Sequence, residues 1–182
     1  ALKYLDIDNN QLTGSIPPEL GSLASLTDLE LSNNQLSGTI PPEIGNLSNL
    51  LSLNLDGNLL QGAIPAELGN LPSLTSLRLF DNQLSGSIPP ELGDIETLSW
   101  LQLSNNQFSG SIPSQLGNLS NLRDLVLNEN QLSGNIPSEL GNLVSLNALQ
   151  LEDNQLSGII PQELCDIPEP IYFNMALNKL CP

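Results

Sequence analysis

The sequence predicts a single α/β solenoid, a stack of similar coils that each contribute a short parallel β-strand and one helical turn. Two observations predict this fold: a strict sequence repeat and the amino-acid composition. Asparagine recurs at an interval of 24 residues, and no insertion breaks the register from the first copy to the eighth, which is partial. With 39% apolar residues and only six aromatic ones among 182, the core must be aliphatic and regular. The repeating asparagines are Asn10, Asn34, Asn58, Asn82, Asn106, Asn130, Asn154 and Asn178.

The strand of each coil is predicted by a Leu-x-Leu pattern that ends three residues before the asparagine, as in Leu29-Glu30-Leu31. Alternation of this kind places the two leucines on one face and the residue between them on the other. Such a short strand is not stable alone, so we expect the copies to stack about 4.8 Å apart in one long parallel sheet.

The asparagine is expected to satisfy backbone groups where the chain leaves the strand. Its amide both donates and accepts, so stacked copies form a ladder inside the turn. A glycine follows four residues later, as at Gly38, and it allows a backbone conformation closed to other residues. The stretch after Ile-Pro, such as Pro18-Glu19-Leu20-Gly21, predicts a single 3₁₀ turn.

Charge and composition exclude several function classes. The chain carries twenty acidic and four basic residues, a net charge of -16 that disfavours nucleic acids and anionic membranes. It contains no histidine, which removes the serine triad and most zinc sites, and no apolar run approaches the ~20 residues of a membrane span. Its hydroxyls lack an activating base, and we expect its carboxylates to lie on an open sheet, where burial would not raise their pKa values. We therefore predict a non-enzyme that has no cofactor and no metal.

Period and pattern together resemble the plant-type leucine-rich repeat family, whose consensus is L-x-x-L-x-x-L-x-L-x-x-N-x-L-x-G-x-I-P-x-x-L-G-x. The resemblance covers essentially the whole chain. It implies a curved superhelix with a parallel concave β-sheet, short lateral strands formed by the Gly-x-Ile-Pro segment, and 3₁₀ turns on the convex side. It also implies an extracellular or cell-surface recognition module, as in receptor-like kinases, receptor-like proteins and polygalacturonase inhibitors.

By this pattern, residues 1–182 form one domain of about seven full repeats and a degenerate C-terminal capping repeat. The N-terminal cap found in relatives is missing, so the Leu2/Leu5/Ile7 edge is expected to be a surface for self-association. Two cysteines occur only in the last units. We expect a Cys165–Cys181 disulfide that staples the closing turn, or, as the alternative, a Cys181 that pairs with a residue outside this chain. A disulfide implies an oxidising compartment, and the sequons at Asn46 and Asn118 fit secretion.

Alternation also assigns the residues that face the concave side, and four of the six aromatic residues fall there, whereas Phe108 and Phe173 take core positions. Aromatic side chains placed in water are candidates for binding, and a neighbouring arginine adds the composition of an interaction hot spot. The alternative is that Trp100 and Phe80 only cover one another or Arg78. The candidate ligand-binding residues are Arg78, Phe80, Trp100, Gln102, Asp124 and Val126.

The concave face is also predicted to be acidic, because ten of the twenty carboxylates fall at positions that alternation assigns to this face. A surface of one sign favours a basic peptide or protein partner. Four acids on the first two strands raise the question of calcium, but their spacing matches no calcium loop and solvated acids are the simpler interpretation. The acidic surface comprises Asp6, Asp8, Asp28, Glu30 and Asp56.

Three functions follow as hypotheses. The first is a non-catalytic scaffold that binds a protein or peptide on the concave face. The second, implied by the resemblance, is an inhibitor of a cell-wall-degrading enzyme or a glycan binder. The third is a protein that adsorbs to ice or another surface through the hydroxyl residues of the lateral strands, an array interrupted at Gln61, Ala63, Asn135 and Ile159.

Overall fold

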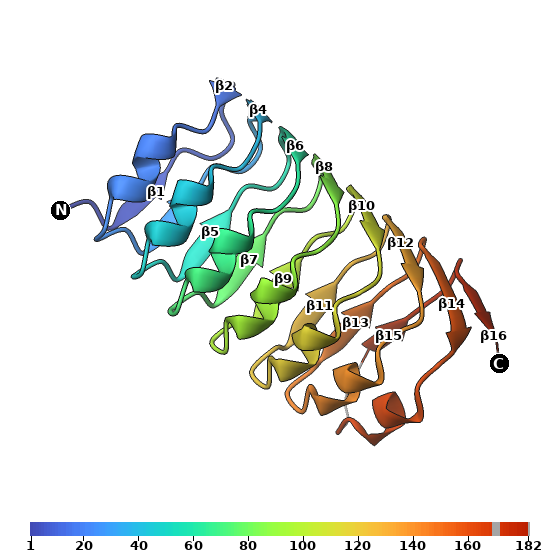
Figure 1. Cartoon of the computed structure of the whole chain (residues 1–182). Helices are drawn as coiled ribbons and strands as arrows, with labels where there is room; N and C mark the ends of the chain where they lie inside the picture. Colours follow the sequence, from blue (N-terminus) through green and yellow to red (C-terminus); the bar gives the residue numbers. More distant parts are fainter. Residues whose placement is uncertain (169–171, 182) are drawn as a thin grey trace.

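The computed structural model describes residues 1–168 and 172–181, which form one continuous stack of coils (Figure 1). Each coil runs from a strand of one sheet to a strand of a second sheet and then through a 3₁₀ helix. The first sheet, here called the concave sheet, is parallel throughout and its strands follow one another in chain order. Its strands are β1 (Tyr4–Asp6), β3 (Asp28–Glu30), β5 (Ser52–Asn54), β7 (Ser76–Arg78), β9 (Trp100–Gln102), β11 (Asp124–Val126), β13 (Ala148–Gln150) and β15 (Tyr172–Asn174).

The second sheet, here called the lateral sheet, is also parallel and runs along another side of the stack (Figure 1). We expected its strands in the Gly-x-Ile-Pro segment, but most of them occupy the four residues that end at the glycine. The glycine has a positive φ, as Gly38 does at 76°, and this bends the chain away from the strand direction before Ile-Pro. The strands are β2 (Thr13–Ser15), β4 (Gln35–Gly38), β6 (Leu59–Gly62), β8 (Gln83–Gly86), β10 (Gln107–Gly110), β12 (Gln131–Gly134), β14 (Gln155–Ile159) and β16 (Lys179–Cys181).

The predicted 3₁₀ turns are confirmed, one in each of the first seven coils. Six of them carry a glutamate in the first turn, where the exposed N–H groups favour a carboxylate. They are η1 (Pro18–Ser22), η2 (Pro42–Asn46), η3 (Ala66–Asn70), η4 (Pro90–Asp94), η5 (Ser114–Asn118), η6 (Ser138–Asn142) and η7 (Gln162–Asp166). None of the described helices is long and apolar enough to cross a membrane.

The glycine at the fourth position of the first six 3₁₀ helices is fixed by stacking between coils. A Cβ atom on Gly69 would lie 2.5 Å from the carbonyl oxygen of Glu91 in the next coil, closer than real Cβ contacts come. The last 3₁₀ helix carries Cys165 at this position, and its side chain is exposed. The glycine of the Leu-Gly consensus is therefore needed because neighbouring 3₁₀ turns approach each other closely.

The core between the two sheets and the 3₁₀ helices is a column of fully buried leucine and isoleucine side chains. Phe108 takes the place of a leucine in it without exposure, as its position in the repeat predicts. We also expected Phe173 in the core, but it is 37% exposed, because β15 has a neighbouring strand on one side only.

The predicted asparagine ladder is confirmed, and Asn130 illustrates it. Its Nδ2 donates to the carbonyl oxygens of Leu127 and Asn128 in its own turn, and to that of Leu103 in the preceding coil, each at 3.1 Å. Its Oδ1 accepts the backbone N–H of Phe108 at 3.0 Å. One side chain thus closes a turn and bonds two coils together, with four otherwise buried backbone groups satisfied.

Candidate functional site

The predicted ligand-binding residues lie on three adjacent strands of the concave sheet. In the parallel register, Trp100 is flanked by Ser76 and Asp124. Gln102 is flanked in the same way by Arg78 and Val126. Phe80 follows β7 by two residues and continues that line toward the turn. We call this set the concave patch: Arg78, Phe80, Trp100, Gln102, Asp124 and Val126.

None of the concave patch belongs to the core. Arg78 is exposed, and the other five side chains are half-buried. A tryptophan and a phenylalanine that keep part of their surface in water beside an arginine have the composition of a binding hot spot.

A cluster of small, buried polar side chains borders the concave patch on β5, just after β5, and on β7. Asn54, Asp56 and Ser76 face the same side of the sheet and are nevertheless buried. The side chains that follow them one coil later are the larger Arg78, Phe80 and Trp100. Ser76 is 8% exposed, and its Oγ has no hydrogen-bond partner. A buried hydroxyl without a partner is uncommon, and here it lies beside the indole of the patch.

We expected that burial would not raise the pKa of the concave carboxylates, but this is wrong for Asp56: its burial among these side chains raises the pKa of its carboxyl group, because the charged form loses water. The positive charge of Arg78 and a hydrogen bond with Asn54 act in the opposite direction, and the charge of Asp81 raises the pKa further. Arg78 therefore favours the charged form of a buried carboxylate, and its own side chain stays exposed at the surface of the patch.

The acids on the first strands are held by local hydrogen bonds. Asp6 accepts the backbone N–H of Asp8 at 3.3 Å, and Asp8 accepts the side-chain amide of Asn9 at 2.7 Å. Thr27 donates its hydroxyl to the carboxylate of Asp28 at 2.7 Å, and Ser52 donates to Glu30 at 2.9 Å. Within residues 1–168 and 172–181, no group of three or more side chains is placed to hold a metal ion.

One further position of each coil, the residue directly before the repeating asparagine, has a structural role that the sequence analysis missed; we call these eight residues the fourth column of the concave face. Each of its residues has a positive φ, at the point where the chain turns after the strand. Asparagine, aspartate and glycine tolerate this conformation, and their enrichment in the column is the signal that could have revealed it. The column consists of Asn9, Asn33, Gly57, Asp81, Asn105, Glu129, Asp153 and Leu177.

The predicted disulfide is not formed among the described residues, since Cys165 and Cys181 are both free and exposed. Cys165 lies in η7, whereas Cys181 pairs in β16 with Ile159 of β14, three residues before η7 begins. The cysteines therefore belong to different sides of the last coils. The sequon residues Asn46 and Asn118 are exposed at the ends of η2 and η5.

The N-terminal edge of the stack carries an apolar depression of about 260 Å³ that includes Leu5, Ile7 and Leu12. Leu2 is 48% exposed beside it. Exposed apolar surface of this kind agrees with the expectation of self-association, which stays a prediction.

Comparison with known proteins decides the family. The family described as "Leucine-rich repeat region" matches residues 1–114, and "Leucine rich repeat" matches residues 96–168. The chain belongs to the leucine-rich repeat family. No curated protein matches it.

Solved structures that are similar to this leucine-rich repeat chain include plant receptor ectodomains. A TDR receptor superposes with a TM-score of 0.97 at 35% identity, over 98% of this chain and 31% of that one. The ectodomain of the Arabidopsis receptor kinase HAESA, in complex with an extended IDA peptide hormone, gives 0.94 at 40% identity, over 98% and 30%. This leucine-rich repeat chain thus spans about a third of the length of these receptor structures.

A plant ice-binding protein is also similar, with a TM-score of 0.74 and 31% identity, over 98% of this chain and 73% of that chain. Relatives of similar fold therefore carry different functions, and the site has to decide between them.

Proposed function

We propose that this leucine-rich repeat chain is a non-catalytic recognition module, located outside the cell, that binds a protein or peptide segment across the concave patch. One observation carries the proposal: Arg78 and Trp100 lie on adjacent strands, with Phe80 two residues beyond Arg78, and all three side chains keep part of their surface exposed on the same face of the sheet. A ligand that lies across this face would cover both aromatic side chains and meet the guanidinium at the same time.

The charge of the chain indicates a basic ligand. The net charge is -16, and acids such as Asp81 and Glu129 surround the patch in exposed positions. Opposite charge on the ligand raises the rate of encounter more than the final affinity. The HAESA structure contains a bound peptide hormone, which agrees with a peptide as the ligand here.

The experiment is a selection of peptides from a displayed library of random 12-residue sequences. We expect enrichment of peptides that contain lysine or arginine. The double variant Phe80→Ala/Trp100→Ala should weaken their binding at least about thirtyfold in calorimetry, because aromatic anchors carry most of the energy of such interfaces.

The matched control is Gln150→Ala, which lies in the same row of the sheet as Gln102, two strands farther on. We expect it to change affinity less than about threefold, and the melting temperatures of both variants to stay close to that of the parent chain. Selected peptides that bind the double variant and the parent chain equally would place the site elsewhere.

A second candidate is adsorption to ice through the lateral sheet, and the similarity to the plant ice-binding protein favours it. Ser87, Ser109 and Ser111 are exposed on or beside adjacent lateral strands. This hypothesis expects thermal hysteresis that Ser109→Tyr abolishes and Phe80→Ala/Trp100→Ala leaves intact, because a bulky side chain interrupts a flat array. Freezing without hysteresis would exclude it. Inhibition of a cell-wall-degrading enzyme rests on the family resemblance alone.

A further inference from the structure

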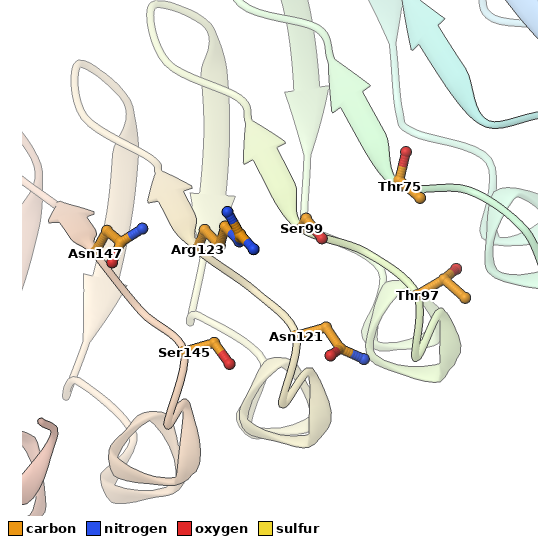
Figure 2. A pocket seen from close by; sticks show the side chains of 7 residues that line it. All are labelled: Thr75, Thr97, Ser99, Asn121, Arg123, Ser145 and Asn147. Atoms are coloured by element: carbon orange, nitrogen blue, oxygen red, sulfur yellow. The ribbon is translucent and has the colours of Figure 1, made fainter.

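A polar groove runs along the side of the stack between the 3₁₀ helices and the strands of the concave sheet (Figure 2). Its volume is about 570 Å³. Figure 2 shows its side chains in two rows, one leading into the concave strands and one beside the 3₁₀ helices. We call it the flank groove, and it is lined by Thr75, Ser99, Arg123 and Asn147 in the first row and by Thr97, Asn121 and Ser145 in the second.

Three of these side chains are fixed by bonds to the backbone of the preceding coil. Thr75 donates its hydroxyl to the carbonyl oxygen of Leu51 at 2.9 Å, and Thr97 donates to that of Leu74 at 2.7 Å. Asn121 donates its side-chain amide to the carbonyl oxygen of Glu96 at 2.8 Å. Their oxygens keep lone pairs that remain available as acceptors.

The other four side chains are not held in this way by any part of the chain that the structure describes. Ser99, Arg123, Ser145 and Asn147 make no side-chain hydrogen bond to any residue that the structure describes, and no described carboxylate lies within 4.0 Å of the Arg123 guanidinium. The flank groove therefore combines fixed acceptors with unbonded donors along its length, which is the complement that a ligand rich in hydroxyl groups needs.

The charge of the flank groove narrows the ligand further. Its lining contains no carboxylate, although the chain has twenty acidic residues. A positive ligand would meet Arg123, and a negative ligand would meet the field of a chain with a net charge of -16. A neutral polar ligand avoids both costs, and we propose that the flank groove binds a neutral oligosaccharide.

A second groove on the same side of the first coils serves as an internal comparison. It has a volume of about 400 Å³, and Leu51 interrupts its polar lining. Thr27, Asn49 and Ser73 in that groove all donate to backbone carbonyl oxygens of the preceding coil, at 3.0, 2.8 and 3.1 Å. In the comparison groove, these three polar side chains are therefore used to bond one coil to the next. The flank groove differs because four of its side chains make no such bond to any residue that the structure describes.

The test is a titration of the isotope-labelled chain with cellotetraose, laminaritetraose and mannotetraose, followed by NMR. We expect the amide shifts of the flank groove to respond to at least one of them with a dissociation constant on the order of 0.1–1 mM, because hydrogen bonds without aromatic stacking give modest affinity. The double variant Arg123→Ala/Asn147→Ala should weaken the binding of that tetrasaccharide at least about tenfold. Both side chains are exposed, so the fold should survive their removal.

Two controls separate this site from its surroundings. Lys3→Ala/Ser25→Ala, in the comparison groove, should leave binding unchanged, and so should Phe80→Ala/Trp100→Ala in the concave patch. The proposal is overturned if no tetrasaccharide, at about 20 mM, changes the amide shifts of the flank groove residues. It is also overturned if trigalacturonate binds more tightly than all three tetrasaccharides. It is also overturned if the sugar response disappears in the concave-patch variant.

Discussion

Replacement of Asn130 by alanine is expected to lower the free energy of unfolding by about 3–5 kcal/mol, measured by urea denaturation. The asparagine bonds three backbone carbonyl groups and the N–H of Phe108, and it is 9% exposed. Alanine reproduces none of these bonds, and the groups are too deeply placed for water to replace all of them.

The loss should also reduce cooperativity, because each coil contacts only its neighbours and Asn130 bonds the fifth coil to the sixth. The matched control is Asn142→Ala, an exposed asparagine at the end of η6, which we expect to change stability by less than about 0.5 kcal/mol. A similar small change in Asn130→Ala would mean that the ladder is dispensable.

Replacement of Gly69 by alanine is expected to destabilise the fold by at least about 3 kcal/mol, seen as a lower urea midpoint and a lower melting temperature. The new methyl group would lie 2.5 Å from the carbonyl oxygen of Glu91 and 2.7 Å from its Cβ atom. Both belong to a neighbouring 3₁₀ turn whose backbone cannot move without breaking its own stacking.

Cys165→Ala is the control for this prediction, because it occupies the same position of the repeat and already carries a Cβ atom. We expect its stability to change by less than about 0.5 kcal/mol, since its side chain is exposed. If Gly69→Ala were equally harmless, the 3₁₀ turns would be more loosely stacked than the structure shows.

Much of the concave patch could be predicted from the sequence because strand register follows from the repeat. Once Trp100 is placed 24 residues after Ser76, a parallel sheet must bring the two together. The buried polar cluster beside them could not be predicted, because the burial of Asn54, Asp56 and Ser76 depends on the size and direction of side chains one coil later. The flank groove could not be predicted either, because the sequence does not show which of its side chains bond to the backbone of the preceding coil and which do not.

The sequence by itself determined the stack, its period, the ladder of asparagines and the set of side chains on the concave face. These properties depend on spacing along the chain, which a strict repeat states directly. Only the tertiary structure decided where the lateral strands begin, that the fourth column is held at positive φ, and that the two cysteines lie apart. Each of these depends on how one coil is positioned on the next, and that arrangement is set by backbone geometry and packing between coils.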